Sequence, residues 1–227
     1  DYQRAHALGE GRVLWTFQDA EVGEAAPGEF AHNAAVLQDG ECWTTLNTPD
    51  GRSWLYPDDT ELHQHWYWPL DGAVSADGST LGLFVVELAE RGDEYLDHVE
   101  PLGVTLVTLD VSSLEVLDVA AAPASGPQLF GWSVADDAEW SYLYGWCLRQ
   151  WGWSPTGHDV ECTSQVFVGR VPRGELTAMP EFWDGEQWQD DPSAAVSVVD
   201  GSRGDVLPLQ VEAVDGRFLA VTKAGDW

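Results

Sequence analysis

Two aspartates lie where strands are expected to end, and their carboxyl groups could perform acid–base chemistry. Asp19 follows the strand-like run of residues 12–18, and Asp71 lies in the aromatic segment 66–72. An apolar setting removes water from a carboxyl group, so we expect a raised pKa for Asp71. Hydrolysis of a glycosidic bond usually needs one protonated carboxyl and one carboxylate. Asp19 and Asp71 are therefore the candidate catalytic pair, although Asp19 could simply cap backbone amides and Asp71 could simply precede a turn.

Polar and aromatic residues near these acids could bind a sugar. His32 and Asn33 open an inner strand, and the amide of Asn33 both donates and accepts hydrogen bonds, which suits a vicinal diol. Satisfying backbone groups is an equally good role for both. Flat rings stack on sugar faces, but Trp also fills gaps between sheets. The candidate substrate-binding residues are His32, Asn33, Trp66, Trp68 and Trp132.

Three further residues could take part in chemistry. Glu87 ends a strand and could be a third acid or a solvated strand edge, whereas His63 and His65 alternate along a strand and could hold a metal. The two histidines have no third ligand nearby, so no metal site is assigned. The sequence has no Gly-rich phosphate loop, no Gly-x-Ser-x-Gly motif and no Cys/His nucleophile arrangement. Dinucleotide binding and serine hydrolysis are therefore not expected.

The three cysteines give one possible cross-link. Cys147 and Cys162 flank a loop between two strand-like runs. A disulfide there would contribute about 3 kcal/mol by closing the loop, and two buried thiols are the alternative. Cys42 is left over and is expected to be a small buried apolar residue.

The elements that must position these residues are repeated hairpins. Asp-Gly pairs at 39–40, 77–78 and 215–216 each separate two apolar strands, and a looser copy lies near residues 136–137. Asp-Gly suits the type I′ turn of a hairpin. Further strands follow at 104–109 and 165–171, whereas helical signals are almost absent. This repeated pattern of strand, turn and strand predicts an all-β protein of up-and-down sheets, and favours a β-propeller over a sandwich.

The ends of the chain and its length complete this prediction. Residues 1–227 are expected to form a single β-propeller domain with about four blades. The strand at residues 12–18 has no evident preceding hairpin partner, so both ends look cut within a blade and the chain is expected to be either a fragment or closed by its two ends.

Charge restricts the partners. The chain carries 39 acidic and 10 basic residues, for a net charge of −29. Such a surface repels nucleic acid and anionic lipid, and no apolar run approaches the length that spans a bilayer. A neutral glycan fits this charge, and so does a divalent cation such as a structural Ca²⁺ on the propeller axis. Solubility alone also explains the acidity. No other cofactor is expected, and we expect a monomer.

Four stretches of sequence carry a resemblance to a known family. They are residues 15–23 with 30–34, Trp-Tyr-Trp-Pro-Leu-Asp-Gly at 66–72, Gly-Trp-Ser-Val at 131–134, and residues 168–172 with 181–188. Together they resemble the five-bladed propeller proteins long classified as a domain of unknown function, which include bacterial endo-D-arabinanases. The similarity spans roughly residues 12–224. It implies five radial blades, a glycan in the central cleft and acidic residues at its floor.

One motif departs from this family. The family typically has Gly-Asp-Thr where this chain has Gln18, Asp19 and Ala20, so the acid is kept while its neighbours change. The resemblance implies a secreted or cell-surface glycoside hydrolase that acts on a furanose polysaccharide such as D-arabinan. The changed motif keeps open the alternatives of a non-catalytic glycan-binding propeller and a protein-interaction propeller.

Overall fold

The computed structural model describes residues 3–21, 31–47, 53–57, 65–90, 99–124, 128–146, 165–200 and 207–223. Across these ranges the chain forms β-strands and one short 3-10 turn, η2 (Pro192–Ala194), with no α-helix. The all-β prediction is confirmed. None of the described residues forms a helix long and apolar enough to cross a membrane.

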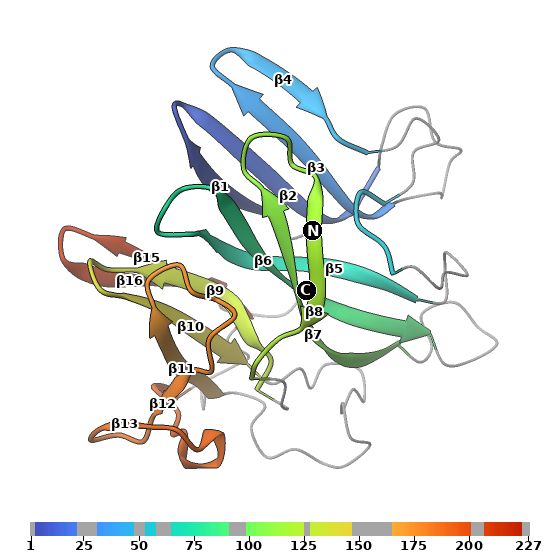
Figure 1. Ribbon diagram of the computed structural model, residues 1–227. Coiled ribbons are helices and arrows are strands. Elements are labelled where there is room, and N and C mark those ends of the chain that lie inside the picture. Colours follow the sequence, from blue (N-terminus) through green and yellow to red (C-terminus); the bar gives the residue numbers. More distant parts are fainter. Residues whose placement is uncertain are drawn as a thin grey trace.

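The described strands form four antiparallel sheets (Figure 1). The first contains β1 (Gln3–Gly9), β2 (Arg12–Ala20), β3 (Ala31–Asp39) and β4 (Cys42–Thr45), and the second contains β5 (His65–Val74), β6 (Thr80–Glu90), β7 (Val99–Asp110) and β8 (Val116–Ala121). The third runs through β9 (Phe130–Asp136), β10 (Trp140–Trp146), β11 (Gln165–Pro172), β12 (Glu181–Trp183) and β13 (Trp188–Gln189), while β14 (Val199–Asp200) also pairs with β11. The fourth contains β15 (Leu207–Val214) and β16 (Arg217–Lys223).

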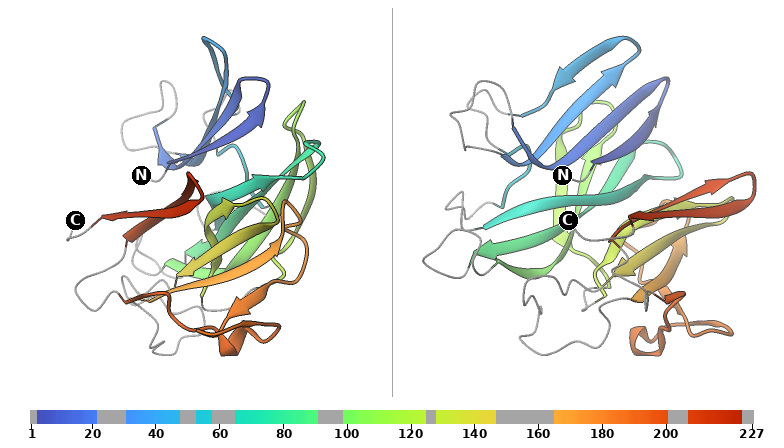
Figure 2. Two further views of the ribbon diagram at one scale, coloured as in Figure 1. Left: turned by 90° about the vertical axis from the view of Figure 1, so that its left-hand side faces the viewer. Right: turned by 180° about the vertical axis from the view of Figure 1, so that it is seen from behind.

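The sheets are arranged radially, as the blades of a propeller (Figure 2). The first strand of each sheet lies innermost: β1 contacts β5, β5 contacts β9, and β9 contacts β15. The last strands of the first two sheets, β4 and β8, are exposed along their whole length. The β-propeller prediction is therefore confirmed, and the four inner strands define its axis.

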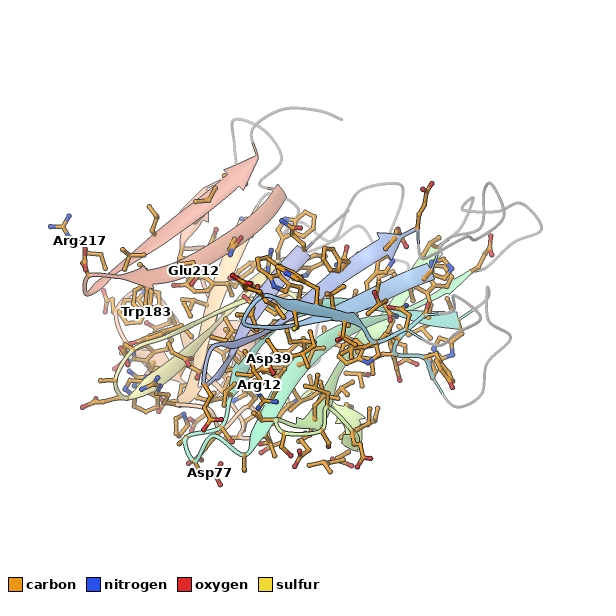
Figure 3. All side chains as sticks on the ribbon, turned by 90° about the horizontal axis from the view of Figure 1, so that it is seen from above. Arg12, Asp39, Asp77, Trp183, Glu212 and Arg217 are labelled. Atoms are coloured by element: carbon orange, nitrogen blue, oxygen red, sulfur yellow. The ribbon has the colours of Figure 1, made fainter. Side chains whose placement is uncertain are left out.

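Hairpins form at all three predicted Asp-Gly positions, but only the β15–β16 turn has Asp-Gly as its two central residues. In the β3–β4 hairpin Asp39 pairs with Cys42, so Gly40 and Glu41 form the turn, and the connection between β5 and β6 is longer, at residues 75–79. At the β15–β16 turn Asp215 and Gly216 have φ values of 49° and 71°, the two positive angles that a type I′ turn requires. Figure 3 labels Asp39, Asp77 and Arg217, which lie at the tight turns of three different sheets, towards one side of the molecule. We call this side of the propeller the hairpin end.

One expectation about the strands was wrong. β2 does have a preceding partner, because β1 pairs with it through a tight turn at Glu10 and Gly11. The buried face of β1 carries Arg4 and His6 alongside Leu8, whereas its exposed face carries Ala5 and Ala7. Because polar residues are buried and small apolar ones are exposed, the usual alternation of a strand could not be recognised in the sequence.

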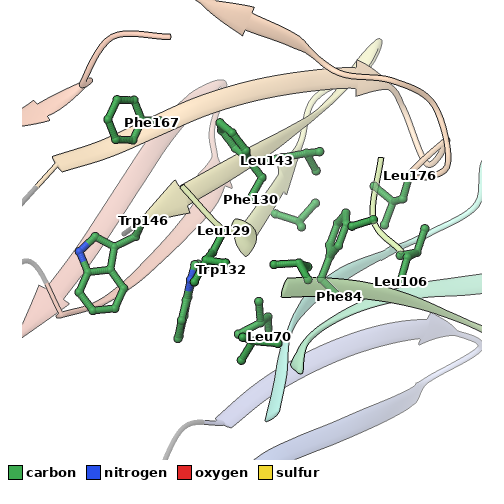
Figure 4. Close-up of a cluster of buried hydrophobic side chains, with 14 of the residues drawn as sticks. Leu70, Phe84, Leu106, Leu129, Phe130, Trp132, Leu143, Trp146, Phe167 and Leu176 are labelled. Atoms are coloured by element: carbon green, nitrogen blue, oxygen red, sulfur yellow. The ribbon is translucent and has the colours of Figure 1, made fainter. Parts of the chain in front are cut away.

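The core lies between the blades. The second sheet, for example, packs against the first sheet on one face and against the third on the other. Phe84, Trp132 and Leu143 pack between the second and third sheets (Figure 4). Phe182 belongs to the same buried cluster. Gly131 has a φ of 109° and lies so close to the Phe84 ring that a Cβ would come within 2.5 Å of it. Several of the described aromatic residues, among them Trp66, Trp132 and Trp146, thus fill the spaces between sheets.

The prediction for Cys42 was wrong, because its side chain is exposed on the outer strand β4. Outer strands of a propeller have no neighbour to bury them, which a strand-like sequence pattern does not show. The predicted disulfide partners Cys147 and Cys162 lie outside the described residues.

Candidate active site

Four of the predicted site residues meet where β2 ends and β3 and β5 begin. The Nδ1 atom of His32 lies 3.2 Å from Oδ1 of Asp19, and Nε1 of Trp68 donates to the same oxygen at 3.0 Å. The His32 ring stacks on Trp66 with centroids 4.2 Å apart and planes inclined by 14°. We call these four residues the Asp19 cluster. It joins positions that are 13 and 49 residues apart in sequence.

Burial separates the roles within the Asp19 cluster. The Asp19 side chain is one-quarter exposed, whereas the His32 side chain is only 4% exposed. His32 is also fixed through its backbone N–H, which donates to Oγ of Ser53 at 3.0 Å. The structure therefore presents Asp19 to solvent and places His32 behind it, where it contacts the carboxylate.

The changed residue beside Asp19 has a structural explanation. Gln18 is buried, and its side-chain amide donates to the carbonyl oxygen of Pro69 at 2.9 Å. This hydrogen bond ties the first sheet to the inner strand of the second. A glycine at this position could not make that contact, so the glutamine stabilises the arrangement of the two blades.

Three predicted sugar-binding residues lie in the core. The Nδ2 atom of Asn33 donates to the carbonyl oxygens of Leu55 and Tyr67 at 2.7 and 2.8 Å, and its Oδ1 accepts from the Leu55 N–H at 2.8 Å. Trp66 and Trp132 are almost fully buried. The structure gives these three side chains packing and backbone-bonding roles, so we do not carry them into the proposed substrate site.

Asp71 lies on the propeller axis and connects its inner strands. Oδ1 accepts from the N–H of Gly72 at 2.9 Å, and Oδ2 accepts from the N–H of Val134 at 2.9 Å and from Oγ of Ser133 at 3.2 Å. Arg4 on β1 brings its Nε atom to 3.7 Å from Oδ2. Ser133 in turn accepts from the Val211 N–H at 2.9 Å, so the network reaches all four inner strands.

The environment of Asp71 raises its pKa. Burial is the largest cause, and it outweighs the opposing effects of the Arg4 guanidinium and of the hydrogen bonds from Val134, Gly72 and Ser133. The predicted direction is confirmed. The cause is enclosure by neighbouring blades, not only the local aromatic sequence.

Asp19 and Asp71 are linked through one short stretch of β5, since Asp19 contacts the side chain of Trp68 and Asp71 lies three residues further on. The pairing of β5 with β6 shifts register between Pro69 and Gly72. Both carboxyl groups therefore lie at the same inner strand.

A second pair of a histidine and an acid, His65 and Glu87, lies at the same end of the strands. Nε2 of His65 is 2.6 Å from Oε1 of Glu87, and Oγ1 of Thr105 donates to Oε2 at 3.3 Å. Glu87 is therefore held in place, which a simple solvated strand edge would not require. In the described ranges no group of three His, Cys, Asp or Glu residues could hold a metal, and His63 lies outside those ranges.

Sequence reasoning missed two axial residues, Arg4 and His6. Nε2 of the buried His6 lies 3.1 Å from Oγ1 of Thr16, and Nδ1 lies 3.8 Å from Oδ1 of Asp71. Burial and, less strongly, Arg4 lower the pKa of His6 to about 4, while Glu212 acts in the opposite direction. An arginine and a histidine alternating with alanines at 4–7 were the only sequence signal.

The lowered pKa of His6 predicts a stability change with pH. In the unfolded chain His6 takes up a proton below its ordinary pKa of about 6.5, while the folded chain resists protonation down to about 4. Stability from this residue is therefore present at pH 7 and is lost as pH falls towards 4, by about 3 kcal/mol in all. Asp71 has the opposite pH dependence. Because its pKa is raised in the folded chain, its contribution to the free energy of unfolding is largest at low pH and is lost as pH rises.

Urea unfolding of the wild type and of His6→Gln at pH 7, 5.5 and 4.5 measures this effect. We expect the free-energy difference between the two proteins to shrink steadily towards acid, because only the wild type carries the titrating ring beside Asp71, Arg4 and Glu212. Parallel pH profiles for the two proteins would show that His6 is not held neutral.

Comparison with known proteins places the sequence in a family. The sequence matches the family described as Domain of unknown function (DUF5005) over residues 1–226. The chain belongs to the DUF5005 family. No curated protein matches the sequence. The predicted membership of a propeller family of unknown function is thus confirmed in its coarser form.

Two crystal structures resemble this DUF5005 chain. One is "a putative hydrolase" from Bacteroides ovatus ATCC 8483, with a TM-score of 0.70 and 13% identity over 99% of this chain and 63% of that one. The other is a glycoside hydrolase family 43 arabinoxylan arabinofuranohydrolase from Bacillus subtilis in complex with cellotetraose, with a TM-score of 0.50 and 11% identity over 96% of this chain and 41% of that one. At these identities the likeness shows the fold, and the DUF5005 chain spans less than two thirds of each neighbour.

Proposed function

We propose that this DUF5005 protein is a glycoside hydrolase that cleaves a furanose polysaccharide such as D-arabinan, with Asp19 and Asp71 as its two carboxyl groups. The observation that carries the proposal is the convergence of a partly exposed, hydrogen-bonded Asp19 and a buried Asp71 of raised pKa on the inner strand β5 of a propeller. A glycoside hydrolase needs two carboxyl groups in different environments.

The two environments assign the roles. Asp71 keeps its proton to a higher pH than an ordinary aspartate, because burial disfavours its charge, so it is the proposed general acid. Asp19 receives two N–H groups on Oδ1, the arrangement that binds a carboxylate oxygen, so it is the proposed base or nucleophile. His32 fixes the direction of Asp19, and the half-buried ring of Trp68 is the proposed stacking surface for a sugar.

The substrate class follows from charge and from the fold neighbours. A chain with a net charge of −29 favours a neutral polymer over an anionic one. The fold neighbour from Bacillus subtilis is an arabinofuranohydrolase, which supports a furanose substrate. The expected secreted or cell-surface location and the monomeric state are part of this proposal, since a polysaccharide is met outside the cell.

A second candidate function is glycan binding without catalysis. It is favoured by the many contacts of Asp71, whose carboxyl group accepts two backbone N–H groups and one hydroxyl and so serves as a brace between blades. A carboxyl group that is fully used in this way is less free to transfer a proton. The presence of Gln18 and Ala20 beside Asp19 points in the same direction.

Release of reducing ends from D-arabinan, arabinoxylan and cellulose tests the proposal. We expect release from a furanose polymer by the wild type and by Asp118→Asn, which removes one exposed charge from the outer strand β8. Affinity for a polymer by calorimetry without any release would support the binding function instead. Neither release nor affinity would contradict both glycan functions and leave protein interaction.

A further inference from the structure

A second candidate site lies on the axis at the hairpin end. A cavity of about 650 Å³ is lined by residues of all four inner strands, together with the turn after β5 and residues near the β9–β10 turn. Sites for small molecules usually measure about 300–1,000 Å³. The cavity lining does not include Asp19, His32 or Trp68, so it is distinct from the Asp19 cluster although Asp71 belongs to its wall.

Three carboxyl groups line this cavity from three different strands: Asp71 on β5, Asp136 at the end of β9 and Glu212 on β15. Figure 3 labels Glu212 between the β15–β16 hairpin and the first sheet. Oδ1 of Asp136 accepts from Oγ of Ser141 at 2.6 Å, so this carboxyl group is fixed at the rim. Arg173 is the one basic residue of the lining, and its Nε lies 3.8 Å from Oδ2 of Asp136. The wall is therefore rich in acceptors and net negative.

His6 supplies an independent sign that a ligand belongs there. Its side chain is only 2% exposed, and its Nε2 atom is taken by Thr16. Its Nδ1 atom lies 3.8 Å from Oδ1 of Asp71, beyond hydrogen-bond distance, and both residues line the cavity. A ligand group with several N–H donors could bond to both atoms at once, whereas His6 and Asp71 are too far apart to bond to each other.

The rest of the lining decides which donor fits. The lining includes Ala5, Ala7, Ala73 and Ala135 and no Phe, Tyr or Trp, so a sugar finds no large stacking surface. The carboxyl groups are also spread apart, since no three acidic or histidine side chains among the described residues could hold one metal ion. Apolar walls between separated carboxylates suit an aliphatic chain with a cationic group at each end.

We propose that this axial cavity binds a small aliphatic diamine or polyamine, with one ammonium group between Asp71 and His6 and the other held by both Asp136 and Glu212. The alkyl chain lies along the part of the wall that is lined by alanines. The negative net charge of the chain attracts such a cation towards the axis. The diamine site shares Asp71 with the proposed hydrolase site: a bound ammonium group favours the charged form of Asp71, whereas a general acid needs the protonated form, so the two roles exclude each other at any one time. Diamine binding needs no turnover, so it is measured independently of the hydrolase assay.

Calorimetric titration of the whole chain with 1,4-diaminobutane tests the inference at constant ionic strength. We expect saturable one-site binding, and none with 1,4-butanediol, which has the same length and no charge. Asp136→Asn and Glu212→Gln are each expected to weaken binding about tenfold or more, since each removes a charge-assisted hydrogen bond. Both residues lie at the cavity rim, so these variants are expected to fold.

The charge-matched control is Asp118→Asn, which removes one negative charge from the exposed strand β8 and is expected to leave the affinity unchanged. Equal binding of the diol, or equal weakening in Asp118→Asn and Asp136→Asn, would overturn the inference by showing that charge screening alone is measured. Unchanged affinity in both rim variants would overturn it as well. Binding of Mg²⁺ that competes with the diamine and needs the same residues would assign the cavity to a metal instead.

Discussion

Replacing Asp19 with asparagine is expected to lower kcat on D-arabinan by about 10²- to 10⁴-fold, the usual effect of removing a general acid or base. Asparagine has nearly the same shape, and its side-chain oxygen can still accept from Trp68 Nε1, so the strand ends should keep their geometry. What is lost is the negative oxygen that activates water or attacks the sugar. Initial rates of reducing-end release measure the effect, with circular dichroism to confirm folding.

Two companion variants sharpen this test. His32 contacts Asp19 and is buried, so His32→Gln is expected to lower kcat while leaving KM nearly unchanged, as befits a positioning residue. A rise in KM without loss of kcat would assign His32 to substrate binding, as the sequence first suggested. Asp118→Asn serves as the charge control, and full activity in Asp19→Asn would move the catalytic carboxylate elsewhere.

The largest effect on stability is expected for Asp71→Ala, which should lower the free energy of unfolding by about 3–5 kcal/mol. The substitution leaves the guanidinium of Arg4 buried without its carboxylate, since Arg4 is only 6% exposed. It also removes the acceptor of the Val134 N–H and of the Ser133 hydroxyl. Urea unfolding followed by tryptophan fluorescence measures the loss.

Asp77→Ala is the matched control for Asp71→Ala. Asp77 also accepts several hydrogen bonds, from Ser75 and Ser79, but it lies in an exposed turn, where water replaces lost partners. We expect a much smaller loss of stability there than for Asp71→Ala. Equal losses in the two variants would contradict the bracing role of Asp71. A stable Asp71→Ala protein without activity would favour a purely catalytic role.

Sequence alone located the hairpins and hence the fold class, because turn chemistry is local. A type I′ turn needs two residues with positive φ, and Asp215 with Gly216 meets that need whatever the rest of the chain does. The same locality explains why Asp19 could be proposed from the sequence, since a polar residue at the end of an apolar strand is visible within a few positions. Even the raised pKa of Asp71 could be anticipated from its apolar neighbours.

Tertiary structure decided which residues meet at the axis. The partners of Asp71 come from β1, β5 and β9, and the lining of the hairpin-end cavity adds Glu212 from β15. These contacts depend on the radial angle between blades, which no short pattern of residues encodes. For the same reason Asn33, a plausible sugar ligand in sequence, proved to be bonded to the backbone of two other segments. The chain pattern thus specifies strands and turns, while the packing of blades determines which polar groups are buried and which face a ligand.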